Sequence, residues 1–271
     1  MKLYAISDLH VSRGANWEAV RALPAYTDDW LIVAGDVSES EHQFAATMTV
    51  LSRRFARVFW TPGNHDLWAH PQSPPAQRGV FKYNRLVGIC RALGILTPED
   101  SYAAWPNPNG ADILIAPIFT LYDYSFRPDD VPATEAIAWA AETNIVSTDE
   151  YFLSPDPFPS RQAWCAARCR YTETRLQSLP PRQPIILAGH FPLRQDLVWL
   201  PRIPRFSIWC GTRLTEAWHT RFPVRAVVHG HLHMRGTYAR DGVDFHEVSL
   251  GYPHQWQAAR GVEGYLRQIL P

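Results

Sequence analysis

Short apolar runs recur along the chain and alternate with segments that have the spacing of helices. Runs of three to six mainly apolar residues bounded by polar or glycine residues predict strands. They are Leu3–Ile6, Trp30–Ala34, Val58–Trp60, Ile113–Ile118, Ile185–Ala188 and Ala226–Val228. The segments between them predict helices at Asn16–Leu23, Glu39–Phe55, Tyr83–Leu93, Thr134–Glu142 and Arg161–Leu179. Because such alternation is typical of βαβ units, we expect an α/β fold in which helices cover the sheets.

The C-terminal part of the chain has a different pattern. Thr237–Tyr238 and Val243–Val248 flank an Asp241-Gly242 pair, which predicts a β-hairpin. We expect residues 1–271 to form a single domain, in which residues 122–159 could form a cap or insertion over an edge of the sheet.

Composition removes several classes of protein. Hydrophobic residues make up 46% of the chain and charged residues 19%, which is typical of globular proteins. The 26 acidic and 26 basic residues cancel, so a general nucleic-acid binder is not expected. No apolar run approaches the roughly 18 residues of a membrane span, and the apolar N-terminal run is too short for a signal peptide. Cys90, Cys165, Cys169 and Cys210 lack metal-site spacing, so we expect reduced, packed cysteines in a cytoplasmic protein.

Charge is distributed unevenly along the chain. The charged residues of 121–156 are almost all acidic, whereas most charged residues from Arg161 to Arg225 are arginines. One interpretation is two solvated surfaces of opposite sign. The other is an arginine-rich face that meets an anionic substrate or an acidic partner.

Polar side chains follow five of the predicted strands at the point where each strand ends. They are Asp8 and His10, Asp36, Asn64-His65-Asp66, His190, and the histidines of His229-Gly230-His231-Leu232-His233. Ligands of open α/β sheets bind at the carboxyl ends of the strands, and the glycines beside these residues let the backbone come close to a ligand. Each motif alone is common, but packing would not place every polar cluster just after a strand.

The residue types indicate a pair of transition-metal ions. Carboxylate and amide oxygens mixed with imidazole nitrogens suit Mn, Fe or Zn rather than Ca. There are too many ligands for one ion, and two ions about 3.5–4 Å apart can clamp a phosphate and generate a hydroxide nucleophile. A carboxylate shared by both ions would hold that spacing, and Asp36 is the candidate for it.

In combination these motifs resemble those of the calcineurin-like metallophosphoesterases. The matching residues are Asp8-x-His10, Gly35-Asp36, Gly63-Asn64-His65-Asp66, Gly189-His190 and Gly230-His231-x-His233. The resemblance spans most of the chain and implies a four-layered α/β/β/α sandwich with a dinuclear metal site at the strand ends.

The same resemblance implies roles for individual residues. One ion would be held by Asp8, His10, Asp36 and His233, and the other by Asp36, Asn64, His190 and His231. His65 would stabilise the transition state and protonate the leaving oxygen, with Asp66 orienting its ring. His229 matches no ligand position, so we interpret it as a packing residue. The implied reaction is hydrolysis of a phosphoester by a hydroxide that bridges the ions.

Two further stretches bear on the substrate. HFPLRQDLVWLPRIPRFSIWCG, from His190, and SLGYPHQW, from Ser249, resemble a subgroup of actinobacterial metallophosphoesterases that includes phosphopantetheinyl hydrolase. This resemblance implies cleavage of a 4′-phosphopantetheine arm from an acidic carrier protein. The candidate substrate-binding residues are Arg194, Trp199, Arg202, Arg205, Tyr252 and His254. The competing interpretation is a proline-rigidified loop whose tryptophans are simply buried.

Three other functions fit the motifs. A phosphomonoesterase acting on a small metabolite would use the same ligands, and the motif order also fits a cyclic-nucleotide phosphodiesterase. A non-catalytic scaffold with the same fold is the third, although the complete ligand set and His65 argue against it.

Overall fold

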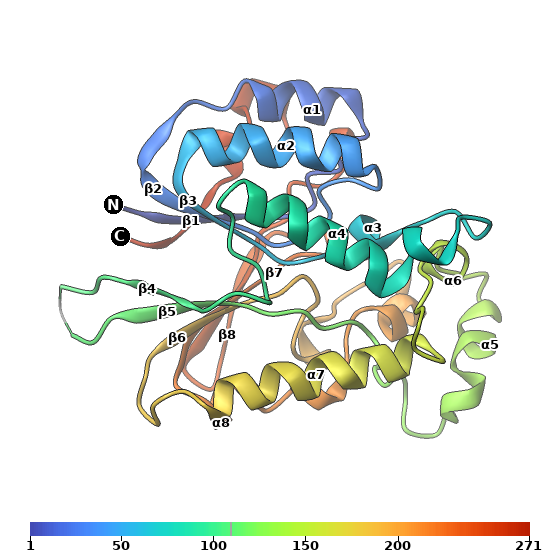
Figure 1. Cartoon of the computed structure of the whole chain (residues 1–271). Coiled ribbons are helices and arrows are strands. Elements are labelled where there is room, and N and C mark those ends of the chain that lie inside the picture. The colour runs from blue at the N-terminus through green and yellow to red at the C-terminus, as the bar shows by residue number, and fades with distance from the viewer. Residues whose placement is uncertain (109) are drawn as a thin grey trace.

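Two β-sheets form the centre of the structure, a computed structural model that describes residues 1–108 and 110–271 (Figure 1). The first sheet has the order β10-β1-β2-β3 and contains β1 (Leu3–Ile6), β2 (Tyr26–Val33), β3 (Phe55–Trp60) and β10 (Arg267–Leu270). The second has the order β4-β5-β6-β7-β9-β8 and contains β4 (Ala103–Trp105), β5 (Ile113–Pro117), β6 (Ile185–Ala188), β7 (Val224–His229), β8 (Gly236–Arg240) and β9 (Val243–Glu247). The inner strands of each sheet are parallel, whereas β10, β4 and β8 pair antiparallel at the edges.

Both faces of each sheet are buried, because successive side chains of a strand point to opposite faces. In β2, Leu31 and Val33 belong to the apolar cluster that contains Phe44 of α2 (Glu41–Arg54). Trp30 and Ile32 belong instead to the cluster between the sheets, which includes residues of β5, β6 and β7. The two sheets therefore pack face to face.

Helices cover the outer faces of both sheets. Figure 1 shows α1 (Gly14–Arg21) and α2 over the first sheet, with α4 (Gly79–Ala92) beside α2, and α7 (Arg161–Gln177) over the second sheet. Trp164 and Cys169 of α7 are buried in the same apolar cluster as Leu187 of β6. The layers are thus α/β/β/α, and this part of the prediction is confirmed.

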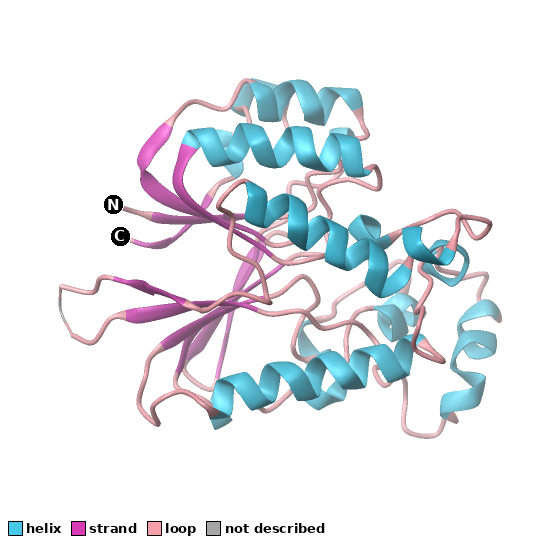
Figure 2. Cartoon of the chain, viewed as in Figure 1, coloured by secondary structure: helices cyan, strands magenta, loops and turns pink. Residues whose placement is uncertain are grey.

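The two sheets meet at the carboxyl ends of their strands. Ser7, directly after β1, forms a parallel bridge with Ser249, two residues after β9. The Ser7 amide donates to the carbonyl of Val248 at 3.1 Å, and Leu250 donates to the carbonyl of Ser7 at 2.8 Å. The short helices α3 (Asn64–Leu67), α5 (Ala136–Ala141) and α6 (Asp149–Phe152) lie at this end, away from both termini (Figure 2).

The predicted strands and helices are present, with boundaries that differ by a few residues. The Thr134–Glu142 helix begins as a 3-10 turn at Ala133–Glu135 and continues as α5. The hairpin is confirmed: Asp241 and Gly242 both have positive φ, 53° and 78°, as a two-residue type I′ turn requires. β4, β10, α3, α6 and α8 (Trp218–Arg221) were not predicted, because these short elements depend on tertiary neighbours rather than on their own periodicity.

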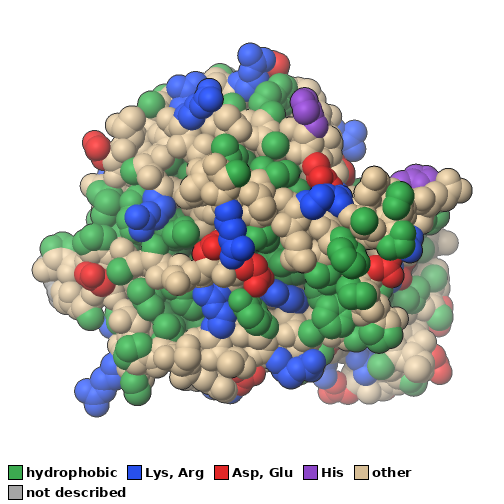
Figure 3. Space-filling view, viewed as in Figure 1, with side chains coloured by type: hydrophobic (Ala, Val, Ile, Leu, Met, Phe, Trp, Pro, Cys, Tyr) green, Lys and Arg blue, Asp and Glu red, His purple; other side chains and the backbone are tan. Residues whose placement is uncertain are grey.

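The uneven charge along the chain is largely neutralised within the fold. Arginines of the basic stretch pair with carboxylates of the acidic one: Arg161 with Glu150 at 2.8 Å and Arg205 with Glu142 at 2.7 Å. The interpretation of two separate solvated surfaces is therefore wrong. On the face seen in Figure 3, side chains of both signs are interspersed.

The remaining expectations concern the cysteines, the cellular location and the absence of a membrane span. The four cysteines are all free and buried, as expected of packing residues. The cytoplasmic location inferred from them stays a prediction. Within residues 1–108 and 110–271, no helix combines the length and the apolar character needed to span a bilayer.

Candidate active site

The seven predicted metal ligands converge where the carboxyl ends of the strands meet. We call these side chains the ligand cluster: Asp8, His10, Asp36, Asn64, His190, His231 and His233. In one half, His233 Nε2 lies 3.1 Å from Asp8 Oδ1 and 3.2 Å from His10 Nε2. These three residues can present one atom each to a single ion.

The other half of the ligand cluster is centred on Asn64. Its Oδ1 lies 3.2 Å from His190 Nε2 and 3.2 Å from His231 Nδ1. Asp36 Oδ2 lies 3.5 Å from His190 Nε2 and 3.9 Å from His10 Nε2 in the first half. Asp36 is thus placed between the two halves, where a carboxylate shared by two ions must lie.

The backbone adopts an uncommon conformation at most of these positions. Of the eight non-glycine residues with positive φ among the described residues, five belong to the ligand cluster: Asp8, His10, Asp36, His231 and His233. Holding a non-glycine residue at positive φ costs on the order of 1–3 kcal/mol of folding free energy. Such a conformation persists only where the surrounding structure imposes it. Strain of this kind concentrates at functional sites, so it supports a functional role for the cluster independently of the residue types.

Two glycines are needed because the ligand cluster is so compact. A Cβ on Gly63 would overlap Asp36 Oδ1, and a Cβ on Gly230 would overlap Asp8 Oδ2. Both glycines therefore permit a close approach of backbone to ligand, as their place in the motifs suggests.

Hydrogen bonds orient the imidazole rings so that lone pairs face the interior of the cluster. His190 Nδ1 donates to the carbonyl of Ala34 at 2.8 Å, and His233 Nδ1 donates to Gln255 Oε1 at 2.7 Å. Each ring therefore turns its Nε2 toward the cluster. Metal-binding histidines commonly have such a partner on the second ring nitrogen.

The ligand cluster contains more carboxylate and imidazole acceptor atoms than protons to satisfy them, as expected of a site that binds cations. Burial, and then the charges of Asp8 and Asp66, raise the pKa of Asp36 well above its usual range, so a bound cation would favour its ionised form. Among the described residues, His231 Nε2 and His10 Nδ1 are buried without a hydrogen-bond partner. The donor set of oxygens and imidazoles suits two transition-metal ions.

His65 lies against the first half of the cluster, with one ring nitrogen free. Its ring is 4.7 Å from that of His10 and stacks on Trp68 at 3.7 Å between centroids. His65 Nδ1 donates to Glu39 Oε1 at 2.8 Å. Burial opposes ionisation of Glu39, but the hydrogen bond from His65 lowers the pKa of this carboxyl to about 2. An ionised Glu39 thus holds the His65 ring in place.

The expectation that Asp66 orients the His65 ring is wrong. The Asp66 carboxylate accepts four backbone amides, those of Gly63, Asp36, Val37 and Ser38, at 2.8–3.1 Å. A side chain committed to these amides cannot also reach the ring. Asp66 instead joins the loop after β2 to the start of α3, and so fixes Asp36 relative to Asn64 and His65.

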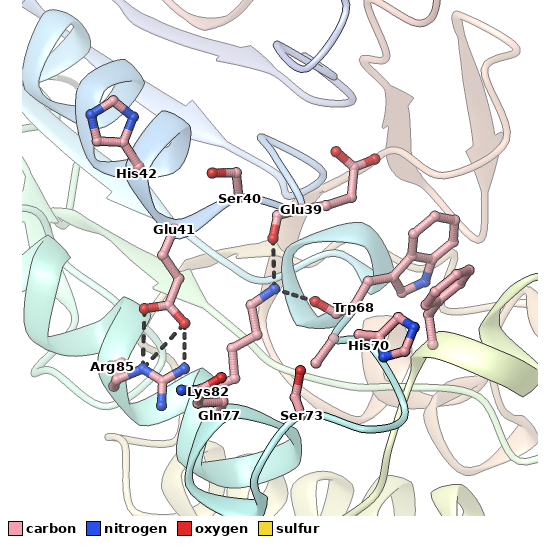
Figure 4. Close-up of a pocket in the computed structure, with 12 residues that line it drawn as sticks. Glu39, Ser40, Glu41, His42, Trp68, His70, Ser73, Gln77, Lys82 and Arg85 are labelled. Carbon is pink, nitrogen blue, oxygen red and sulfur yellow. Dashed lines mark hydrogen bonds and ion pairs between the residues drawn. The ribbon is translucent and has the colours of Figure 1, made fainter.

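A cavity of about 780 Å³ is lined by Glu39 and Trp68, both of which also contact the His65 ring (Figure 4). The buried ammonium of Lys82, another lining residue, donates to the carbonyl of Glu39 at 2.8 Å and to the carbonyl of Trp68. Lys82 thereby connects two of the residues that contact the His65 ring. Glu41 and Arg85, further along the wall, form an ion pair.

A smaller pocket of about 230 Å³ opens directly over the ligand cluster; we call it the site pocket. The polar part of its lining consists of Asp36, Asn64, His65, His231, His233, Tyr252 and Gln255. The apolar part, which we call the apolar wall, consists of Leu200, Ile203, Phe206 and Leu232. Tyr252, predicted to bind substrate, thus lines the pocket, and its ring stacks on His10 at 4.5 Å.

The other predicted substrate-binding residues lie at varying distances from the pocket. Arg194 and Arg205 are not among its lining residues: Arg194 pairs with Asp196 at 2.8 Å, and Arg205 pairs with Glu142. Trp199 is 66% exposed rather than buried. Arg202 lines a neighbouring cavity, and His254 lies on the outer side of Tyr252, 6.2 Å away between centroids.

Sequence reasoning missed several residues that shape the site. Glu39 follows Asp36 by three positions but belongs to none of the quoted motifs. Asp149, from the predicted cap segment, accepts from Asn64 Nδ2 at 2.9 Å and from Trp68 Nε1 at 2.6 Å. Gln255 reaches His233 from the loop after β9. No spacing in the sequence marks these residues, because each contact joins segments brought together only by the fold.

His229 lies behind the cluster rather than in it. The side chain is buried at the end of β7, and its Nδ1 lies 3.3 Å from the carbonyl of Gly230. Burial lowers the pKa of His229 to about 4, so the ring is neutral at physiological pH.

Comparisons with known proteins agree with this geometry. Residues 1–235 match the family model described as calcineurin-like phosphoesterase. The chain is 45% identical over 271 residues to the [acyl-carrier-protein] phosphodiesterase PptH of Mycobacterium tuberculosis, with 99% of this chain and 83% of the relative covered. The crystal structure of phosphopantetheinyl hydrolase (PptH) from the same organism superposes with a TM-score of 0.93 at 44% identity, covering all of this chain and 96% of the other. This chain belongs to the calcineurin-like phosphoesterases.

Proposed function

We propose that this chain hydrolyses the phosphodiester that links a 4′-phosphopantetheine arm to a carrier protein. The main supporting observation is the mixed lining of the site pocket, which combines His65 and four residues of the ligand cluster with the apolar side chains of Leu200, Ile203, Phe206 and Leu232. A phosphodiester with one apolar substituent fits such a pocket, since the pantoyl end of the arm carries two methyl groups beside its phosphate. The 45% identity to a carrier-protein phosphodiesterase supports the same substrate.

The ligand cluster would hold two ions of Mn, Fe or Zn, with Asp8, His10, Asp36 and His233 on one side and Asp36, Asn64, His190 and His231 on the other. When bound, such ions neutralise phosphate oxygens and lower the pKa of water. Ser7 and Ser249 donate to Asp8 Oδ2 at 2.6 and 2.7 Å and keep its other oxygen turned to the cluster.

His65 would act as the general acid. With Nδ1 committed to Glu39, the proton that it can deliver is on Nε2, the atom left free in the site pocket. The serine oxygen of a carrier is a poor leaving group unless it is protonated, so a positioned acid accelerates its departure. Tyr252, stacked on His10, closes the side of the pocket next to the cluster.

An acidic carrier would meet cations at the rim of the pocket. Arg13 lies over the Tyr252 ring, 5.7 Å from its centroid. Arg202 is exposed beside the apolar wall. Within the described part of the chain neither guanidinium has a carboxylate partner, unlike Arg194 and Arg205, so both are available to an acidic surface.

In this proposal residues 1–271 act as one catalytic domain, and residues 122–159 form a cap that supports the pocket. The hydrogen bond from Asn64 to Asp149 of α6 supports that role for the segment.

The test is incubation of the metal-reconstituted protein with a purified holo carrier protein, followed by intact-mass analysis. We expect the carrier to lose the mass of the phosphopantetheinyl group. Parallel assays with bis(p-nitrophenyl) phosphate, p-nitrophenyl phosphate and cyclic AMP separate the alternatives. Turnover of a small ester with no change in the carrier would refute the substrate while keeping the phosphoesterase.

A further inference from the structure

A second cavity adjoins the apolar wall of the site pocket. It has a volume of about 440 Å³ and is lined by Leu200, Pro201, Arg202, Ile203, Met234 and Gln255. We call it the arm cavity. Leu200, Ile203 and Gln255 line both cavities, so the arm cavity continues from the site pocket away from the ligand cluster. Its volume is within the range of clefts that bind small molecules.

The wall between the two cavities is rigidly built. Prolines at positions 201 and 204 restrict the backbone of the segment that carries Ile203. Leu200 and Met234 pack against the small apolar cluster of Phe126 and Leu232. Leu232 and Met234 alternate in sequence with the ligands His231 and His233 in the loop after β7. Leu232 lines the site pocket, and Met234 lines the arm cavity.

The arm cavity and His65 occupy different parts of the surroundings of the ligand cluster. The arm cavity reaches the cluster through Gln255, whose Oε1 accepts from His233 Nδ1 at 2.7 Å. His65 lines the site pocket but not the arm cavity, and its ring packs on His10 at 4.7 Å. A phosphodiester bound at the cluster can therefore place one substituent in the arm cavity and the other beside His65. The substituent beside His65 receives the proton and leaves.

On the basis of the proposed function, we infer that the arm cavity binds the pantetheine arm, while the carrier serine lies beside His65. The methyl groups of the arm contact Ile203 and Leu200. The Arg202 guanidinium and the Gln255 amide offer polar groups to the amides of the arm. Water adds to phosphorus, the bond from phosphorus to the serine oxygen breaks, and the proton from His65 goes to that oxygen. The products are the apo carrier and 4′-phosphopantetheine, which remains in the cavity until it is released.

Ile203 offers the sharpest test, because its side chain is 43% exposed and its replacement does not threaten folding. Ile203→Glu places a charge against the methyl groups, and we expect the dissociation constant of 4′-phosphopantetheine, measured by calorimetry, to rise about tenfold or more. Ile203→Leu should restore wild-type affinity. Inorganic phosphate, which reaches only the ligand cluster, should bind both variants as it binds the wild type.

The matched control is Leu214→Glu, which introduces the same charge at an apolar residue that is 51% exposed and lines neither cavity. We expect it to bind 4′-phosphopantetheine as the wild type does. Unchanged affinity in Ile203→Glu would overturn the inference, and so would a carrier left with phosphoserine after cleavage, because that product requires the opposite orientation. If the wild type removes no arm from the carrier at all, the proposed function fails instead.

Discussion

Asn64 donates a hydrogen bond from Nδ2 to Oδ1 of Asp149 at 2.9 Å, across 85 residues of chain. Because the amide nitrogen is held in this way, the amide oxygen turns to His190 and His231. The same Asp149 oxygen accepts from Trp68, whose ring stacks under His65. One buried carboxylate thus orients a metal ligand and supports the general acid.

Replacing Asp149 should therefore weaken the second half of the ligand cluster. In Asp149→Ala the Asn64 amide can rotate, and we expect the affinity for the ion on the Asn64 side to fall about 10–100-fold. Metal analysis after dialysis against graded chelator concentrations measures this. Glu142→Ala, which removes an exposed carboxylate of the same segment, is the control. Two equally retained ions in Asp149→Ala would contradict the prediction.

His65 should matter most when the leaving group is poor. His65→Ala removes the proton donor but no residue of the ligand cluster, so both ions should remain bound while kcat on a holo carrier falls roughly 10²–10⁴-fold. On bis(p-nitrophenyl) phosphate, whose leaving group departs readily without a proton, the loss should be smaller. Equal losses on both substrates would show that His65 does not act as the acid.

Asp36 should be indispensable for both ions. Its Oδ2 lies between His190 and His10, and its Oδ1 accepts the amide of His65 at 2.8 Å. We expect Asp36→Asn to lose both ions together, whereas His10→Ala should lose chiefly one. Metal content per chain, determined on folded protein with an unchanged circular dichroism spectrum, distinguishes the two patterns. Retention of one ion by Asp36→Asn would show that the carboxylate is not shared.

Local signals in the sequence were sufficient to predict sheets covered by helices and polar residues gathered at the strand ends, whereas the four-layer order and the ligand roles followed from the family resemblance. Apolar runs specify buried strands, and polar residues after parallel strands collect at one edge of a sheet. The positive φ of Asp8 and His231 could not be read from the sequence, since both residue types usually adopt negative φ. Only Gly230, next to His231, indicated an unusual backbone; Asp8 is flanked by Ser7 and Leu9.

The residues that support the cluster could not be predicted in the same way. Asp66 is adjacent to His65 in sequence, yet it binds backbone amides, whereas Glu39 reaches the ring from another loop. Arginines of the basic stretch were expected at the substrate, but carboxylates from distant segments neutralise Arg205 and Arg194. Pairing of side chains depends on tertiary packing, which no spacing along the chain records.

Glu39 should make the stability of the protein dependent on acid pH. Folding lowers the pKa of this carboxyl from 4.5 to about 2: burial opposes the shift, but the hydrogen bond from His65 exceeds it. A group whose pKa is lowered on folding stabilises the folded state above its unfolded pKa, and this stabilisation is lost as the pH falls toward the folded pKa. The contribution of Glu39 should therefore be complete above about pH 4.5 and decline toward pH 2.

Urea unfolding of metal-free wild type and Glu39→Gln, followed from about pH 6 to about pH 2, measures this contribution. We expect Glu39→Gln to be less stable at pH 6 and the difference to shrink as the pH falls, because the protonated glutamic acid of the wild type then resembles the glutamine. Glu18→Gln, at a carboxylate whose side chain is 67% exposed, should differ little from the wild type at any pH. A difference for Glu39→Gln that stays constant over the whole range would mean that the charge of Glu39 does not stabilise the fold through His65.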